Sequence, residues 1–193
     1  LVMHRKLMLS FLLFISAAAV AQLKSPEEFL GYKIGTRYTP HFKMVNYFQH
    51  VAASVPSMVK LQTYGYTNEG KELLMAVISS PENMSRIEDI RKNNLRLTGM
   101  LKDQPGNVAA PAIVWLSYNV HGNEPASSEA AMMVLYALVD PNNTQTKEWL
   151  KNTVIIIDPC INPDGRDRYV NWYNNAVGTS YNTDPQSREH KEP

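Results

Sequence analysis

AIVWLSY, at residues 112–118, is a continuous apolar run of strand length, and it decides the fold. Such a run is typical of a strand covered on both faces. Strong helix formers follow at residues 126–139, with Pro125 at the expected first helical position. A second apolar run, VIII, occupies residues 154–157. Strand, helix and strand with a crossover of this length predict a βαβ unit, and hence a parallel pair of strands in an α/β sheet.

The chain before this unit is expected to add a helix and a hairpin. Residues 41–53 predict an amphipathic helix, because their apolar side chains recur near helical spacing. These side chains are Phe42, Val45, Phe48 and Ala52. Residues 59–64 and 73–78 read as strands, and the turn formers at residues 65–70 between them predict an antiparallel hairpin.

Three other segments complete the outline. Residues 83–102 read as one charged surface helix that ends at the loop 103–107. A short amphipathic stretch reaches Leu150. After Gly165 the chain becomes polar and aromatic, and we interpret it as a long loop.

The start of the chain is typical of a secretory signal peptide. Basic residues at positions 4–6 precede an apolar run at 7–20, and small residues then predict cleavage between Ala21 and Gln22. About 14 apolar residues are too few to cross a bilayer as a helix. We therefore expect a signal peptide over residues 1–21 and a leader segment over residues 22–37. The mature protein is expected to be secreted or periplasmic, with no membrane anchor.

Composition and charge exclude other classes. Apolar residues make up 44% of the chain and charged residues 19%, as in an ordinary globular domain. The net charge of +1 gives no reason to expect nucleic acid as a partner. Cys160, the single cysteine, cannot form an internal disulfide. Because it lies in an apolar run, we interpret it as a small buried side chain rather than a nucleophile.

The junction between the first buried strand and its helix carries His121 and Glu124. In open α/β sheets, ligands bind beyond the carboxyl ends of the strands, which is where this junction lies. An imidazole nitrogen and a carboxylate oxygen are both suitable for Zn²⁺, at about 2.0–2.2 Å. Gly122 gives the turn the backbone freedom to aim both side chains at one point. The alternative is a solvated turn in which Glu124 favours the positive end of the following helix.

The second buried strand ends at NPDG, residues 162–165. By itself this segment reads as a plain turn, because Pro and Gly beside Asp are ordinary turn residues. If the two strands are parallel, however, Asn162 and Asp164 lie next to His121 and Glu124. We therefore expect Asn162 and Asp164 to form the neighbouring wall of one cleft.

These motifs, in this order, resemble the zinc metallocarboxypeptidases, the carboxypeptidase A-like family of peptidases. YGYTNEGKEL at residues 64–73 is similar to the family's G-x-S-x-E-G-R segment, with Thr67 and Lys71 as variants. The resemblance covers about residues 38–170. It implies a three-layer α/β/α fold with a mixed, partly parallel sheet that is truncated at its C-terminus. Residues 38–193 would then be the N-terminal portion of the catalytic domain.

The resemblance also implies chemistry. His121 and Glu124 would be the first two ligands of one zinc ion per complete domain, and peptide or protein C-termini would be the substrates, cleaved by a metal-activated water. A third, histidine ligand, a general-base glutamate and a carboxylate-binding Asn-Arg pair have no match here. We expect these residues beyond Pro193, so the chain as given is expected to be an inactive fragment.

Four further residues are candidates for the family's other roles. Arg166 and Arg168 lie too close to the NPDG turn to take the role of the oxyanion-stabilising arginine, for which Arg188 is an alternative. His190 lacks the strand-end context of the third ligand and reads as a solvated loop residue.

Three other functions stay open at this point. A zinc amidase or deacylase on the same fold would act on cell-wall peptides or acyl-amino acids. A catalytically dead domain would bind peptides only. A non-enzymatic secreted α/β domain would carry the motifs by coincidence.

Overall fold

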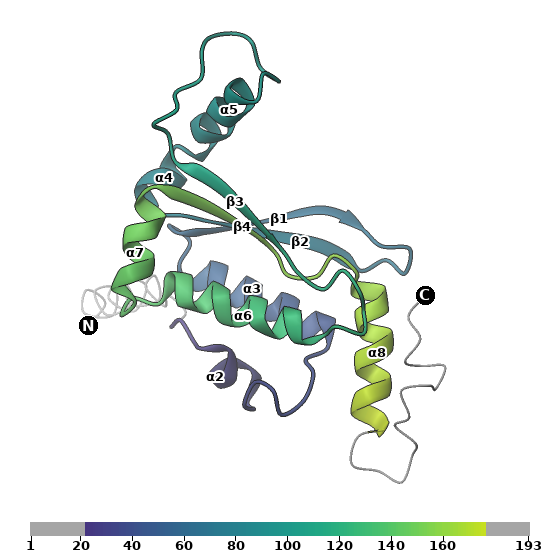
Figure 1. Cartoon of the computed structure of the whole chain (residues 1–193). Helices are drawn as coiled ribbons and strands as arrows, with labels where there is room; N and C mark the ends of the chain where they lie inside the picture. Colours follow the sequence, from purple (N-terminus) through teal and green to yellow (C-terminus); the bar gives the residue numbers. More distant parts are fainter. Residues whose placement is uncertain (1–21, 177–193) are drawn as a thin grey trace, which may run out of the picture.

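The computed structural model describes residues 22–176, which form a four-stranded sheet with helices against it (Figure 1). The strands are β1 (Val59–Tyr66), β2 (Glu72–Ile78), β3 (Ala112–Ser117) and β4 (Thr153–Asp158). The helices are α2 (Pro26–Leu30), α3 (His41–Ser54), α4 (Pro81–Ser85), α5 (Ile87–Leu97), α6 (Ala126–Val139), α7 (Thr144–Lys151) and α8 (Pro163–Ala176). None of the helices in this part of the chain has the length and apolar character that a membrane crossing needs.

The sheet is mixed, with the strand order β1-β2-β4-β3. β1 and β2 form an antiparallel hairpin, and β2 also pairs antiparallel with β4. β3 and β4 pair in parallel, from Ala112 opposite Thr153 to Ser117 opposite Asp158. The crossover between them contains α6 and α7. The predicted hairpin and the predicted βαβ unit are both confirmed, as is the mixed α/β fold.

The core lies between the sheet and helices α3 and α6, which cover one of its faces (Figure 1). Buried side chains from both helices and from the strands meet there, among them Met44, Tyr47, Phe48, Val51, Met132, Leu135, Ala76, Ile78 and Ile157. The predicted helix over residues 41–53 is confirmed, but the predicted inward position of Phe42 is wrong, since Phe42 is 59% exposed. The buried stripe of α3 instead begins at His41 and continues through Met44, so Phe42 falls outside it.

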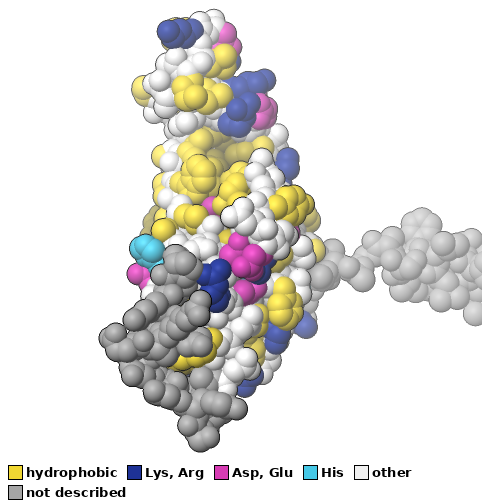
Figure 2. Space-filling view, turned by 90° about the vertical axis from the view of Figure 1, so that its right-hand side faces the viewer, with side chains coloured by type: hydrophobic (Ala, Val, Ile, Leu, Met, Phe, Trp, Pro, Cys, Tyr) yellow, Lys and Arg dark blue, Asp and Glu magenta, His cyan; other side chains and the backbone are white. Residues whose placement is uncertain are grey.

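The other face of the sheet is more open. An apolar hollow there is lined by strand residues that include Met75, Val77 and Ile156, and the first turns of α5 cover one end of it. Figure 2 shows hydrophobic side chains gathered below the projecting α5 segment. β3 is an edge strand in the described residues, and Trp115 is 61% exposed. The prediction that this strand is covered on both faces is therefore wrong for residues 22–176.

The single helix predicted over residues 83–102 is divided into α4 and α5. Arg86, between the two helices, has a backbone outside the helical region, with φ −121° and ψ 26°. The cause lies in α4, where the buried side chain of Asn83 donates hydrogen bonds to Leu150 O and Lys151 O, both at 3.0 Å. α4 is thereby fixed to the end of α7, while α5 continues in its own direction and ends at Leu97.

The prediction of a long loop after Gly165 is wrong for residues 166–176, because residues 163–176 form helix α8; the later residues of that segment lie outside the described part of the chain. Asn162 caps the helix: its side-chain oxygen accepts a hydrogen bond of 2.9 Å from Gly165 N. Pro163 follows as the first helical residue. Asn before Pro is a recognised helix-start signal, and it was available in the sequence.

Candidate metal centre

The junctions that follow β3 and β4 lie side by side. Tyr118 N donates a hydrogen bond of 3.0 Å to Asp158 O, and Ile161 N donates one of 3.0 Å to Tyr118 O. Asn162 N continues the pattern with a bond of 3.2 Å to Asn119 O. The parallel pairing of the strands thus extends into the loops, as the sequence predicted. Both sequence motifs meet at this edge of the sheet.

His121 and Glu124 turn their side chains toward each other. His121 Nδ1 lies 3.3 Å from Glu124 Oε2, and the turn between them is closed by a hydrogen bond of 3.1 Å from Glu124 N to His121 O. Their side chains are 66% and 64% exposed, so both are accessible from solvent. The two side chains thus lie within hydrogen-bond distance of each other; their role as metal ligands stays a prediction.

The separation of these two atoms suits zinc. Two ligands of a tetrahedral ion at about 2.0–2.2 Å are separated by about 3.3–3.6 Å along the edge of the tetrahedron. The donor set, one imidazole nitrogen and one carboxylate oxygen, is also one that zinc accepts. Within residues 22–176, no three His, Cys, Asp or Glu side chains are grouped so that they could hold a metal. His190 and Arg188 lie outside the described residues.

Asp164 contacts the turn of the β1–β2 hairpin. Its Oδ1 accepts hydrogen bonds from Thr67 Oγ1 at 2.7 Å and from Lys71 Nζ at 3.1 Å. Partial burial acts to raise the pKa of Asp164, but these two donors outweigh it and hold the pKa below its usual range. The two variants in the hairpin motif, Thr67 and Lys71, thus bind the same carboxylate. The assignment of Asn162 and Asp164 to a substrate cleft stays a prediction.

Asn119 connects the loop between β3 and α6, residues 119–125, to the core. It is buried and has a positive φ of 53°, a left-handed conformation that Asn tolerates better than most residues. Its Nδ2 donates a hydrogen bond of 2.6 Å to His121 O. Its Oδ1 accepts from Ser128 Oγ at 3.0 Å and from Arg166 Nη1 at 2.8 Å. The side chain of Asn119 therefore bridges the backbone of His121 and the interior.

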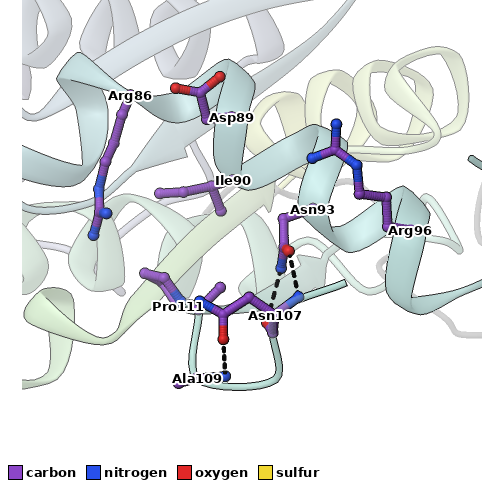
Figure 3. A pocket seen from close by; sticks show the side chains of 9 residues that line it. Arg86, Asp89, Ile90, Asn93, Arg96, Asn107, Ala109 and Pro111 are labelled. Carbon is purple, nitrogen blue, oxygen red and sulfur yellow. Dashed lines mark hydrogen bonds between the residues drawn. The ribbon is translucent and has the colours of Figure 1, made fainter. Parts of the chain in front are cut away.

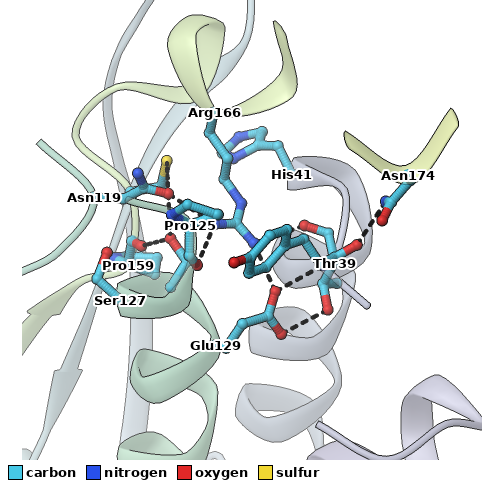
Figure 4. A network of polar contacts seen from close by, with 12 residues as sticks. Thr39, His41, Asn119, Pro125, Ser127, Glu129, Pro159, Arg166 and Asn174 are labelled. Carbon is cyan, nitrogen blue, oxygen red and sulfur yellow. Dashed lines mark hydrogen bonds and ion pairs between the residues drawn. The ribbon is translucent and has the colours of Figure 1, made fainter. Parts of the chain in front are cut away.

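Arg166 lies at the centre of a buried polar network (Figure 4). Besides Asn119, its guanidinium donates to Pro125 O at 2.7 Å, Thr39 O at 2.7 Å and Glu129 Oε1 at 2.9 Å. The carboxylate of Glu129 also accepts from the backbone N–H and the hydroxyl of Thr39. This role of Arg166 is not apparent from the sequence. The acceptors of Arg166 come from segments as far as 127 positions away, so no local pattern could have revealed it.

Cys160 adjoins the same network. It is buried, and its thiol lies 3.8 Å from Asn119 Oδ1. Burial raises the pKa of this thiol to about 12, so the thiolate is scarce at neutral pH. The prediction of a small buried side chain is confirmed.

A separate hollow lies between α5 and residues 107–111 (Figure 3). It has a volume of about 260 Å³ and is lined by Arg86, Asp89, Ile90, Asn93, Arg96, Asn107, Ala109, Ala110 and Pro111. Hydrogen bonds between Asn93 and Asn107 close one side of it. None of the predicted site residues lines this hollow, so it is not part of the candidate metal centre.

The chain belongs to the zinc carboxypeptidase family, whose model matches residues 44–190. The matched region contains the hairpin motif, the His121–Glu124 pair and the NPDG segment.

Solved structures agree on the fold. A structure of thrombin-activatable fibrinolysis inhibitor is similar with a TM-score of 0.51 and 17% identity, over 68% of this chain and 27% of that one. A carboxypeptidase A from Helicoverpa armigera is similar with a TM-score of 0.50 and 19% identity, over 72% of this chain and 30% of that one. The present chain therefore spans less than a third of the length of these carboxypeptidase-like structures.

Proposed function

We propose that the protein is a zinc-dependent metallocarboxypeptidase, in which His121 and Glu124 hold the metal and C-terminal peptide bonds of peptides or proteins are hydrolysed. The observation that carries the proposal is the 3.3 Å approach of His121 Nδ1 to Glu124 Oε2 at the carboxyl end of a parallel strand. Membership of the zinc carboxypeptidase family supports it.

The two ligands would have distinct roles in the site. When bound, zinc polarises the scissile carbonyl and lowers the pKa of a water molecule. His121 would provide a neutral nitrogen donor, and Glu124 a negative oxygen donor that offsets part of the metal's charge. Their high exposure leaves the far side of the ion accessible to a substrate. The hydrogen bond from Asn119 Nδ2 to His121 O supports the proposal by fixing the backbone of His121.

Zinc content and release of terminal residues test the proposal together. Purified full-length protein is expected to contain about one zinc ion and to release C-terminal amino acids from a peptide with a free C-terminus. It should spare the same peptide carrying a C-terminal amide, because the free carboxylate is absent. A chelator should abolish release and added zinc should restore it.

Variants and substrates separate the alternatives. His121→Ala and Glu124→Ala should each lose zinc and activity, whereas Glu148→Gln, on the exposed surface of α7, should retain both. Cleavage of acyl-amino acids or of cell-wall peptides in place of terminal residues would favour the amidase or deacylase alternative. Zinc content that is unchanged in His121→Ala would overturn the proposal.

We also propose that residues 22–193 are inactive when they are expressed alone. Within residues 22–176 no third His, Cys, Asp or Glu side chain is grouped with His121 and Glu124, and the chain spans only 27% and 30% of the similar structures. Zinc-dependent release of terminal residues by residues 22–193 alone, at a rate comparable with that of the full-length protein, would contradict this.

Secretion is a separate proposal, which rests on the signal-like sequence of residues 1–21. N-terminal sequencing of the mature protein from its native host should begin at Gln22. A retained N-terminus on the native protein would contradict the proposal.

A further inference from the structure

We propose that Arg166 is a positioning residue for the metal loop, residues 119–125, and that it sets the zinc affinity by fixing both ends of this loop at once. The inference rests on the proposed function, because it assigns a consequence to the His121–Glu124 pair as a zinc site.

One nitrogen of Arg166 binds both ends of the loop. Nη1 donates to Asn119 Oδ1 at 2.8 Å, before His121, and to Pro125 O at 2.7 Å, directly after Glu124. Because both acceptors share this nitrogen, the separation of the two ends of the loop is defined by the geometry of one planar group. Asn119 then passes the constraint on through its hydrogen bond of 2.6 Å to His121 O.

The other nitrogen ties Arg166 to the helical layer. Nη2 donates to Thr39 O, two residues before α3, and to Glu129 Oε1 in the first turn of α6. The Arg166 side chain is fully buried and that of Glu129 is 6% exposed. The loop that carries the exposed side chains of His121 and Glu124 is thereby held against the buried layer of α3 and α6.

Preorganisation explains why the hydrogen bonds of Arg166 should alter the affinity for zinc. His121 and Glu124 are exposed and would otherwise sample many arrangements, which a metal would have to order on binding. Residues that orient metal ligands typically alter the affinity by 10–100-fold when they are replaced. A contact network that only stabilised the fold would leave the zinc affinity of the folded protein unchanged.

The test measures the zinc dissociation constant of full-length protein by chelator competition, together with urea unfolding. Arg166→Lys keeps the charge but cannot reproduce four directed hydrogen bonds from one planar group. Asn119→Asp keeps an acceptor for Arg166 and Ser128 and tolerates the left-handed backbone, but it has no N–H for His121 O. This second variant removes the donor to His121 O and puts a buried carboxylate in its place, so its zinc affinity is compared once urea unfolding shows that it is folded. It decides the question if Arg166→Lys fails to fold.

Two control variants separate positioning from general stability. Arg168→Lys changes an exposed arginine two positions along the same helix, at 3.5 Å from Glu69. Leu150→Ala empties a buried position in α7 that has no place in the Arg166 network. It serves as a destabilised control once urea unfolding shows that it is folded.

We expect Arg166→Lys and Asn119→Asp to weaken zinc binding about 10-fold or more, and both controls to stay within about twofold of the wild type. Retention of wild-type affinity in folded Arg166→Lys or in Asn119→Asp would overturn the inference, and so would an equal loss in Leu150→Ala. If instead the proposed function is wrong, the result is different: the wild type and His121→Ala would bind zinc equally or not at all.

Discussion

The hydroxyl of Tyr64 donates a hydrogen bond of 2.6 Å to Oδ2 of Asp158, which lies 94 positions later in the chain. Tyr64 is the extra residue at a register shift between Thr63 and Gly65 of β1, and such a bulge re-aims a side chain. Asp158 is buried at the carboxyl end of β4, and its backbone oxygen accepts from Tyr118 N. The contact thus links the hairpin to the strand end beside the metal loop.

Replacement of Tyr64 by Phe is expected to raise the pKa of Asp158 further. Burial already raises this pKa above its usual value of 3.8, and the phenol partly opposes that effect. The loss of a hydrogen bond to the carboxylate should lower the free energy of unfolding by about 1–2 kcal/mol at neutral pH. Urea unfolding and NMR titration of the Asp158 carboxyl group measure the two effects. Tyr66→Phe, at an exposed position in the same strand, should change neither.

The sign of the pH dependence provides an internal check on this prediction. A carboxyl group whose pKa is raised in the folded state favours folding fully below its unfolded pKa, and this contribution is lost as the pH rises through the folded value. Tyr64→Phe should therefore lower the free energy of unfolding least below pH 3.8, where Asp158 is protonated in both the folded and the unfolded state. An equal deficit at pH 3 and pH 7 would show that the charge of Asp158 is not involved.

Glu129→Gln is expected to be among the most destabilising single changes in the chain. Glu129 and Arg166 form a buried ion pair at 2.9 Å, with side chains 6% and 0% exposed. Removal of one charge leaves the other buried without its partner, which costs about 3–5 kcal/mol. Glu148→Gln breaks an exposed pair with Lys151 and should cost less than about 1 kcal/mol. Similar urea midpoints for the two variants would contradict this prediction.

The sequence was sufficient for the elements whose apolar patterns are local. The buried run at residues 154–157 and the helix formers at 126–139 predicted β4 and α6, because pattern and packing agree there. The position of His121 and Glu124 after a strand predicted their approach, since it depends only on a short turn. The Cys160 side chain was correctly assigned from its apolar neighbours.

The errors arose where distant contacts decide the outcome. Nothing near Arg86 indicates a helix break, because the break depends on Asn83 binding the end of α7, almost 70 positions later. Arg166 was considered only for a family role, while its buried partners come from three separate segments. Helix α8 is a different case, since the Asn162-Pro163 start signal was local and was interpreted only as a turn.

Cys160 should be inert to alkylation in the native protein. Burial raises the pKa of its thiol to about 12, so at pH 8 less than about one thiol in a thousand is the reactive thiolate. Iodoacetamide labelling followed by mass spectrometry should show no modification in native buffer and one modification in 6 M guanidinium chloride. The native reaction should accelerate only under conditions that unfold the protein. Rapid labelling of the folded protein would contradict both the burial and the interpretation of Cys160 as a structural side chain.

The stability of the protein should fall as the pH is lowered from about 7 to 5, and His41 should contribute to this fall. Burial lowers the pKa of His41 from its usual 6.5, although Asp167 acts in the opposite direction. The neutral ring lies 3.3 Å from Glu72 O. The unfolded chain then takes up a proton near pH 6.5 before the folded chain does, so each such histidine contributes a slope of at most about 1.4 kcal/mol per pH unit. Urea unfolding at several pH values measures the slope.

His50 should contribute to the pH dependence of stability in the same direction as His41, because burial and, to a lesser extent, Lys24 lower its pKa. His41→Gln retains a side-chain N–H for Glu72 O but cannot be protonated, so it should make the pH slope shallower while leaving the fold intact. The double variant that also carries His50→Gln should show a still shallower dependence of stability on pH. The measurement is confined to pH 5–7.5, since carboxyl groups titrate below that range. Identical slopes in the wild type and in both variants would show that the burial of these two rings does not control the acid sensitivity of the fold.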